Sequence, residues 1–163
     1  MKLRIPPALK AEHAELHREL VRATKAGGRT GTAARAVAKL MHPHFVKEEE
    51  YALPPLGALA ALSRGKIANG ATNVLKLTDK LERELPRMLA EHKAIVAALQ
   101  RLVRAAKADK TPEFAHFAEK LIAHAQTEEQ VSYPTALLIG RYLKAARAGS
   151  DAKGAQARVR HAR

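Results

Sequence analysis

The feature that most constrains the fold is a set of four long stretches in which core-type residues recur at alternating steps of three and four. Residues at these steps lie on one face of an α-helix. Four such faces can bury one another in a bundle. The pattern therefore predicts an all-α fold, an antiparallel up-and-down four-helix bundle. The clearest face consists of Leu81, Leu85, Met88, His92, Ile95, Leu99 and Leu102.

Proline and glycine separate the four stretches and set the expected domain organisation. We expect one domain over residues 1–146 and a basic, disordered C-terminal tail over residues 147–163, which mix Gly, Ala, Ser and basic residues without an apolar stripe. The expected helices run from Pro6–Pro7 to Gly27–Gly28, from Thr32 to Pro54–Pro55, from Thr72 to Lys107, and from Pro112 to Arg147.

Composition narrows the functional classes. The chain has 163 residues, no cysteine, and 29 Lys and Arg against 16 Asp and Glu, a formal charge of +13. Charge alone would permit a nucleic-acid partner. Aromatic residues, which stack on bases, make up only 4% of the chain. We therefore favour the interpretation that the positive charge reflects solubility and a basic tail. No apolar run is long enough to span a membrane. The N-terminus lacks the apolar core of a secretion signal, so we expect a cytoplasmic protein.

The predicted helix faces are interrupted by histidine and glutamate, and these interruptions repeat. Ala-Glu-His occurs at residues 11–13 and again at residues 90–92. The pattern His-x-x-x-Glu-Glu, with a proline after it, starts at His44 and again at His124. Matching motifs in the same order indicate a duplicated helical hairpin with pseudo-two-fold symmetry.

The repeat places the interruptions at one level of the bundle. The midpoints between consecutive motif histidines fall in or beside the predicted turns, so equal helix lengths bring the histidines to a similar height. A carboxylate buried at that level costs several kcal/mol unless something pairs with it. Without cysteine, a metal ion there must be held by imidazole and carboxylate, which suit iron, manganese or zinc. The predicted ligands are His13, His44, Glu48, His92, His124 and Glu128.

These four ordered motifs resemble those of the hemerythrin-like HHE cation-binding domains, over about residues 8–145. The resemblance implies two non-haem iron ions, bridged by two carboxylates and an oxo or hydroxo group. It implies interaction with dioxygen, peroxide or nitric oxide. The alternative it leaves open is an iron or oxygen sensor or store that acts through a partner without turnover. No substrate-binding motif is visible, so the ligands do not decide whether the protein is an enzyme, nor do they set its oligomeric state.

The chain departs from the oxygen carriers of that family. Those carriers have a His-x-x-x-His pair on the third helix, where this chain has Val96 four residues after His92. Their fourth-helix carboxylate is an aspartate five residues after a histidine, whereas Glu128 follows His124 by four. Both differences favour the His and Glu sites of iron-sensing or peroxide-handling relatives over simple reversible oxygen carriage.

Several residues beside the predicted ligands allow more than one role. His17 would offer a fifth imidazole on the first helix, although Leu16 already fits the apolar face. We expect Glu49 and Glu129 to be solvated or to orient ligands, and we prefer a surface role for Glu12 and Glu91. Core filling is the expected role of the two tyrosines that follow the His-x-x-x-Glu motifs, Tyr51 and Tyr133.

Overall fold

The computed structural model describes residues 3–66 and 70–161, with side chains as far as Gly149. Within these ranges the structure contains helices and turns and no strand. The all-α prediction is therefore confirmed for the described part of the chain. The long helices are α1 (Pro7–Thr24), α2 (Gly28–Lys47), α4 (Ala71–Ala108), α5 (Pro112–Thr127) and α6 (Tyr133–His161).

Short irregular helices continue or connect the long ones. A π-helical turn, η1 (Glu48–Ala52), follows α2 directly, and a second π-helical turn, η3 (Glu128–Ser132), joins α5 to α6. Between η1 and α4 the chain forms the 3-10 helix η2 (Pro54–Ala58) and the single-turn helix α3 (Leu59–Leu62). The two π-helical turns begin at the glutamates of the two His-x-x-x-Glu-Glu motifs.

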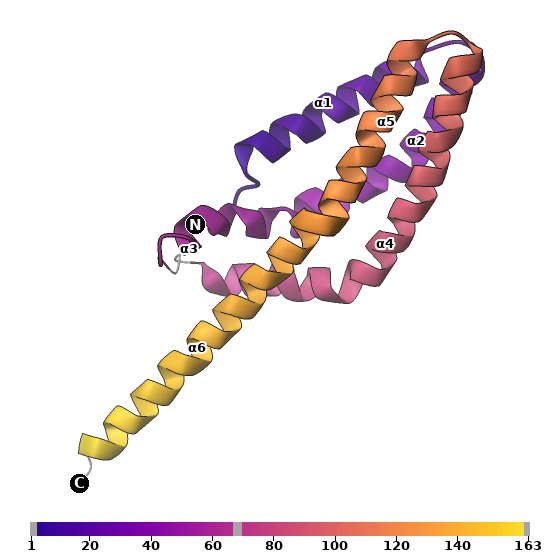
Figure 1. Ribbon diagram of the computed structural model, residues 1–163. Helices are drawn as coiled ribbons and strands as arrows, with labels where there is room; N and C mark the ends of the chain where they lie inside the picture. The colour runs from indigo at the N-terminus through magenta and orange to yellow at the C-terminus, as the bar shows by residue number, and fades with distance from the viewer. Residues whose placement is uncertain (1–2, 67–69, 162–163) are drawn as a thin grey trace.

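The long helices pack into a bundle (Figure 1). α4 contacts α2, α5 and α6, and α1 contacts α2 and α5. α4 contains Pro86 and bends along its length; proline causes such bends because it removes one backbone hydrogen bond.

The apolar core consists of two clusters with a polar layer between them. One cluster includes Leu16, Ile95 and Phe117, and the other includes Leu81 and Met88. On α4, His92 lies between Met88 of one cluster and Ile95 of the other. The polar layer is therefore enclosed on both sides by packed side chains, which exclude water from it.

A π-helical turn changes which residues face the core after it. On the fourth helix, the steps of four and three that join His124, Glu128 and Val131 predict Val131 on the apolar face, but its side chain is 56% exposed. The reason is that a π-helical turn holds more residues than an α-helical turn, so the period of 3.6 does not continue through η3. Ser132 and Tyr133 are buried instead.

The last helix differs from the sequence prediction in its length. Leu143 is buried, and α6 continues beyond it to His161, away from the bundle (Figure 1). This extension covers residues 147–161, for which the sequence predicted a disordered tail. Ala and Arg, which have high helix propensity, make up seven of those 15 residues. None of the helices in the described ranges is long and apolar enough to cross a membrane.

Candidate metal centre

The six residues predicted as ligands lie together in the polar layer of the bundle. His13 comes from α1, His92 from α4, and the two His–Glu pairs come from the ends of α2 and α5 and the π-helical turns that follow. All six side chains are buried, with exposed fractions between 0% and 7%. They form two groups: His44, Glu48, His92 and Glu128, and His13, His124 and Glu128.

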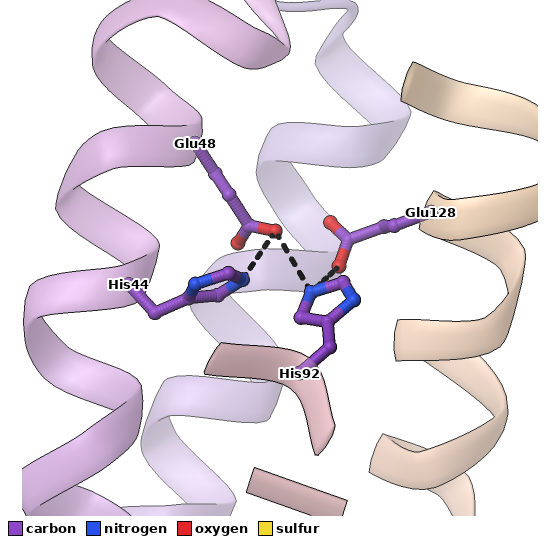
Figure 2. Close-up of side chains that lie close together, drawn as sticks. All are labelled: His44, Glu48, His92 and Glu128. Carbon is purple, nitrogen blue, oxygen red and sulfur yellow. Dashed lines mark ion pairs between the residues drawn. The ribbon is translucent and has the colours of Figure 1, made fainter. Parts of the chain in front are cut away.

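In the first group, four side chains from three helical segments point to one place (Figure 2). Oε1 of Glu48 lies 3.1 Å from Nε2 of His44 and 3.7 Å from Nε2 of His92. Oε2 of Glu128 lies 3.6 Å from the same His92 nitrogen. One ligand atom of each residue lies within 4.8 Å of those of the others, a spacing that one metal ion can span.

In the second group, two histidines face the other oxygen of Glu128. Its Oε1 lies 3.3 Å from Nε2 of His13 and 3.2 Å from Nε2 of His124. Oε2 of Glu48 also turns to this side, 3.9 Å from Nε2 of His13. Each of the two carboxylates therefore presents one oxygen to each group.

Buried polar atoms without partners show that the layer fits a cation. Among the described residues, Oε2 of Glu48 and Nε2 of His124 are buried and make no hydrogen bond. Their ion-pair contacts, 3.9 Å to His13 and 3.2 Å to Glu128, do not replace the hydrogen bonds that these atoms would make with water. Imidazole nitrogen and carboxylate oxygen are suitable donors for iron, manganese and zinc. Ions bound in the two groups would satisfy these atoms.

An outer ring of glutamates contacts the other ring nitrogens of the histidines. Nδ1 of His44 lies 2.9 Å from Oε2 of Glu91, and Nδ1 of His92 lies 3.0 Å from Oε1 of Glu129. When Nδ1 carries the proton and donates it to the carboxylate, the Nε2 lone pair is free to bind a metal ion. Glu91 and Glu129 thus orient two of the predicted ligands.

His124 has the same arrangement, whereas His13 has a longer contact that is not a hydrogen bond. Nδ1 of His124 lies 3.2 Å from Oε1 of Glu12, and Nδ1 of His13 lies 3.8 Å from Oε1 of Glu49. The preference for a plain surface role at Glu12 and at its counterpart Glu91 is therefore wrong. Both glutamates precede a histidine in the Ala-Glu-His motif, yet each contacts a histidine on a different helix. Sequence proximity could not reveal that pairing.

Glu91 has further partners that the other outer glutamates lack among the described residues. It accepts a hydrogen bond from Nζ of Lys47, and another, 3.2 Å long, from Nε of Arg87. Burial would raise the pKa of Glu91, but the hydrogen bonds from His44 and Lys47 lower it. Glu91 therefore stays ionised and accepts a hydrogen bond from Nδ1 of His44.

We expect replacement of Glu91 or Glu12 by glutamine to weaken one position of the centre more than the other. Each change should lower metal affinity about 10- to 100-fold, the usual effect of removing a partner of a ligand histidine. Glu91→Gln should affect the position that contains His44, and Glu12→Gln the position that contains His124. Titration with cobalt(II), followed optically, measures both steps. Equal effects of the two variants on both steps would contradict the assignment.

Charges within the layer favour the protonated forms of His44 and His124 when no metal ion is bound. Burial alone would lower the pKa of His124, but contact with the Glu128 carboxylate raises it to about 9. Burial would likewise lower the pKa of His44, but contact with the Glu48 carboxylate raises it above its ordinary value. Burial would raise the pKa of Glu48, but His44 and His92 hold it well below its usual range. A metal ion must therefore displace protons to bind.

This predicts a pH dependence for the metal-free protein. The pKa of His124 is about 9 in the folded protein, against an ordinary value of 6.5. Its contribution to the free energy of unfolding is therefore complete below pH 6.5 and is lost as the pH rises to 9. The loss is on the order of 3 kcal/mol. Thermal melts of metal-free protein between pH 6 and 9.5 measure it. His124→Gln should flatten the profile and His17→Gln should not; an unchanged wild-type melting temperature would contradict the prediction.

The structure adds Tyr133, which the sequence analysis assigned to core filling. Its hydroxyl donates a 2.5 Å hydrogen bond to Oε1 of Glu48 and lies 3.2 Å from Nε2 of His92 and 3.5 Å from Nε2 of His44. Burial and then the charge of Glu48 raise its pKa, so the phenol stays neutral. The corresponding position of the first repeat is Leu53. The two halves of the centre therefore differ.

Two other candidates lie apart from the centre. His17 is exposed, so the His-x-x-x-His pair of α1 adds no fifth imidazole to either group. The hydroxyl of Tyr51 is buried and makes no hydrogen bond among the described residues. The Tyr51 ring contacts Nζ of Lys80, 4.6 Å from the ring centroid. Core filling therefore describes Tyr51 but not Tyr133.

Comparison with known protein families gives one match. The family model of the hemerythrin HHE cation binding domain matches residues 5–136, which include all six side chains of the centre. Searches of curated proteins and of solved structures found no significant match. The matched region covers most of the chain and includes the buried His and Glu residues of both groups. The chain belongs to the hemerythrin HHE cation-binding family.

Proposed function

We propose that this is a non-haem di-iron protein that interacts with dioxygen, peroxide or nitric oxide. In this proposal His44 and His92 bind one ion, and His13 and His124 bind the other. Glu48 and Glu128, which each present one oxygen to each group, would hold both ions. The stretch from the first to the last of these ligands lies within the matched family domain.

The observation that carries the proposal is the orientation of Glu128. Its Oε1 faces His13 and His124, and its Oε2 faces His92. A carboxylate that served one ion or one salt bridge would not need histidines on both oxygens. With one carboxylate from each repeat and two imidazoles for each ion, the donor set can hold a pair of metal ions in a bundle core, with more histidine and fewer carboxylates than the commoner Glu and Glu-x-x-His arrangement.

We infer that the helices form the bundle in an antiparallel up-and-down order. α1 and α2, and likewise α4 and α5, are joined by short turns and contact each other. Short turns between packed helices require the chain to reverse direction. This order supports the centre because motifs at equal distances from each turn then meet at one level.

The residues around the centre suit redox chemistry with a small ligand. Iron bound there would supply the electrons for reaction with dioxygen, peroxide or nitric oxide, and would keep open coordination positions. The two apolar clusters exclude water from the layer, and hydrogen bonds from Nδ1 to outer glutamates hold Nε2 of His44, His92 and His124 toward it. Tyr133 can donate a hydrogen bond on the side of His44 and His92 only.

Metal analysis of protein purified without chelator, combined with optical spectra, tests the proposal. We expect two iron ions per chain and near-ultraviolet bands that change between anaerobic, aerobic and peroxide-treated samples. Zinc or manganese in their place, with no spectral response, would contradict the di-iron proposal. Spectral changes without turnover of peroxide would identify the sensor or store rather than a catalyst.

A further inference from the structure

A large cleft lies beside the centre, between α1 and the segment formed by η1, η2 and α3. Its volume is about 1110 Å³, and its walls are mainly apolar or small residues, among them Ile5, Pro7, Ala14 and Leu56. Ligand sites have this character: apolar walls bury the body of a ligand, and a few polar groups orient it.

Two cations line this cleft and form no ion pair with any residue that the structure describes. Arg4 and Lys10 line it, both side chains are exposed, and within the described ranges no carboxylate forms an ion pair with either of them. The two unpaired cations therefore give the cleft a positive charge that favours an anionic group.

The inner end of the cleft reaches the metal centre. Glu49 lines the cleft, and its Oε1 lies 3.8 Å from Nδ1 of His13. That nitrogen is buried, and His13 as a whole is only 3% exposed, yet Nδ1 makes no hydrogen bond among the described residues. A molecule in the cleft can therefore change the contact between Glu49 and His13.

The second repeat has a groove at the corresponding place, and its walls differ from those of the cleft. That groove, of about 410 Å³, lies beside Glu129, the counterpart of Glu49. Leucines occupy its walls where the cleft has Lys10 and Gly57. By the spacing of the repeat, Pro6, Lys10, Glu49, Pro54 and Gly57 of the cleft correspond to Leu85, Leu89, Glu129, Pro134 and Leu137 of the groove.

Gly57 also holds the N-terminal segment at the cleft. A Cβ atom at this position would lie 2.1 Å from the carbonyl oxygen of Arg4, which is a severe overlap with backbone. Only glycine allows this close approach. The first repeat therefore has Gly57 where the second has Leu137, and this glycine lets the backbone of Arg4 pass close to η2.

We propose that this cleft binds an amphiphilic organic anion, a molecule with one carboxylate and an apolar chain, next to the His13 side of the centre. The carboxylate pairs with Arg4 and Lys10, and the chain lies against the apolar walls. Binding needs only the cleft. Its effect on the centre rests on the proposed function, because it is transmitted from Glu49 to His13.

Decanoate, decanol and decyltrimethylammonium share a chain length and differ in the charge of the head, so they serve as probes. In calorimetric titration of the full-length protein we expect decanoate to bind one molecule per chain, at least about tenfold more tightly than decanol. The cationic probe should not bind. These measurements are made on metal-free and on iron-loaded protein.

Variants locate the site. Arg4→Gln combined with Lys10→Gln should weaken decanoate binding at least about tenfold, while Lys39→Gln, at an exposed lysine of α2 outside the cleft, should not change it. Lys10→Leu copies the groove of the second repeat. It should retain decanol binding and lose much of the preference for decanoate. Circular dichroism melts check that each variant is folded.

The outcomes separate this proposal from the proposed function. Equal affinity for decanoate and decanol, or wild-type affinity in the double variant, would overturn the anion site whatever the metal content. In iron-loaded protein, decanoate should shift the optical bands, and the double variant should abolish the shift. Decanoate binding with no shift would overturn the link to His13. A protein that binds decanoate but no metal would retain the cleft and lose the di-iron centre.

Discussion

Replacement of Glu128 by glutamine is expected to remove both metal ions, not one. Its two oxygens face histidines of different groups, so the variant loses a ligand from each position. The amide has the same shape, but it brings an NH₂ group into a layer where the neighbouring atoms are ligand nitrogens. We expect the metal content to fall from two ions per chain to less than half of one after gel filtration, measured by elemental analysis.

The adjacent residue provides the control for this experiment. Glu129 contacts Nδ1 of His92 and no Nε2, and it is partly exposed. Glu129→Gln should therefore weaken binding without abolishing it, by about 10- to 100-fold. A Glu128→Gln protein that retains one tightly bound ion would show that this carboxylate serves only one position, and would rule out the bridging role.

Removal of the metal ions is expected to destabilise the bundle strongly. Without them, four histidines and two carboxylates remain buried in one layer of the core. An ion present at about 1,000 times its dissociation constant contributes about 4 kcal/mol to folding. For a chain of this length that corresponds to a decrease in melting temperature of roughly 10 °C or more. Calorimetric scans before and after chelation at pH 7 measure it.

Adding iron back to the chelated protein distinguishes the loss of metal from irreversible unfolding during chelation. The chelated protein should regain its melting temperature when iron(II) is added under anaerobic conditions, and Glu128→Gln should show little response to either treatment. If the chelated wild-type protein melts at the same temperature as the loaded one, the buried layer is satisfied without metal. The six residues would then form a structural ion-pair network instead of a metal centre.

The sequence could predict which residues enter the polar layer because that information is local. Whether a side chain faces the core depends on its position in the helical period, and His44 with Glu48 four residues later occupy one face of one helix. The repeated motifs then placed residues such as His13 and His92 at one level. Those predictions needed no knowledge of which helix contacts which.

Tyr133 shows where the local argument fails. The period of 3.6 residues, continued past Glu128, points to Val131, and that residue is exposed. The π-helical turn η3 shifts the register and brings the tyrosine hydroxyl to Glu48. Such a turn changes local hydrogen bonding and has no clear signal in residue type, and therefore a periodic pattern cannot detect it.

The sequence by itself determined the helical stretches, the duplication and the six side chains that enter the core. Only the tertiary structure decided how they combine: which histidines share an oxygen of Glu128, and that Glu12 contacts His124 and Glu91 contacts His44. It also decided that one repeat has an open cationic cleft where the other has leucines. The physical reason is that the direction of a side chain from its own helix follows from the period, whereas contacts between helices depend on how the helices pack.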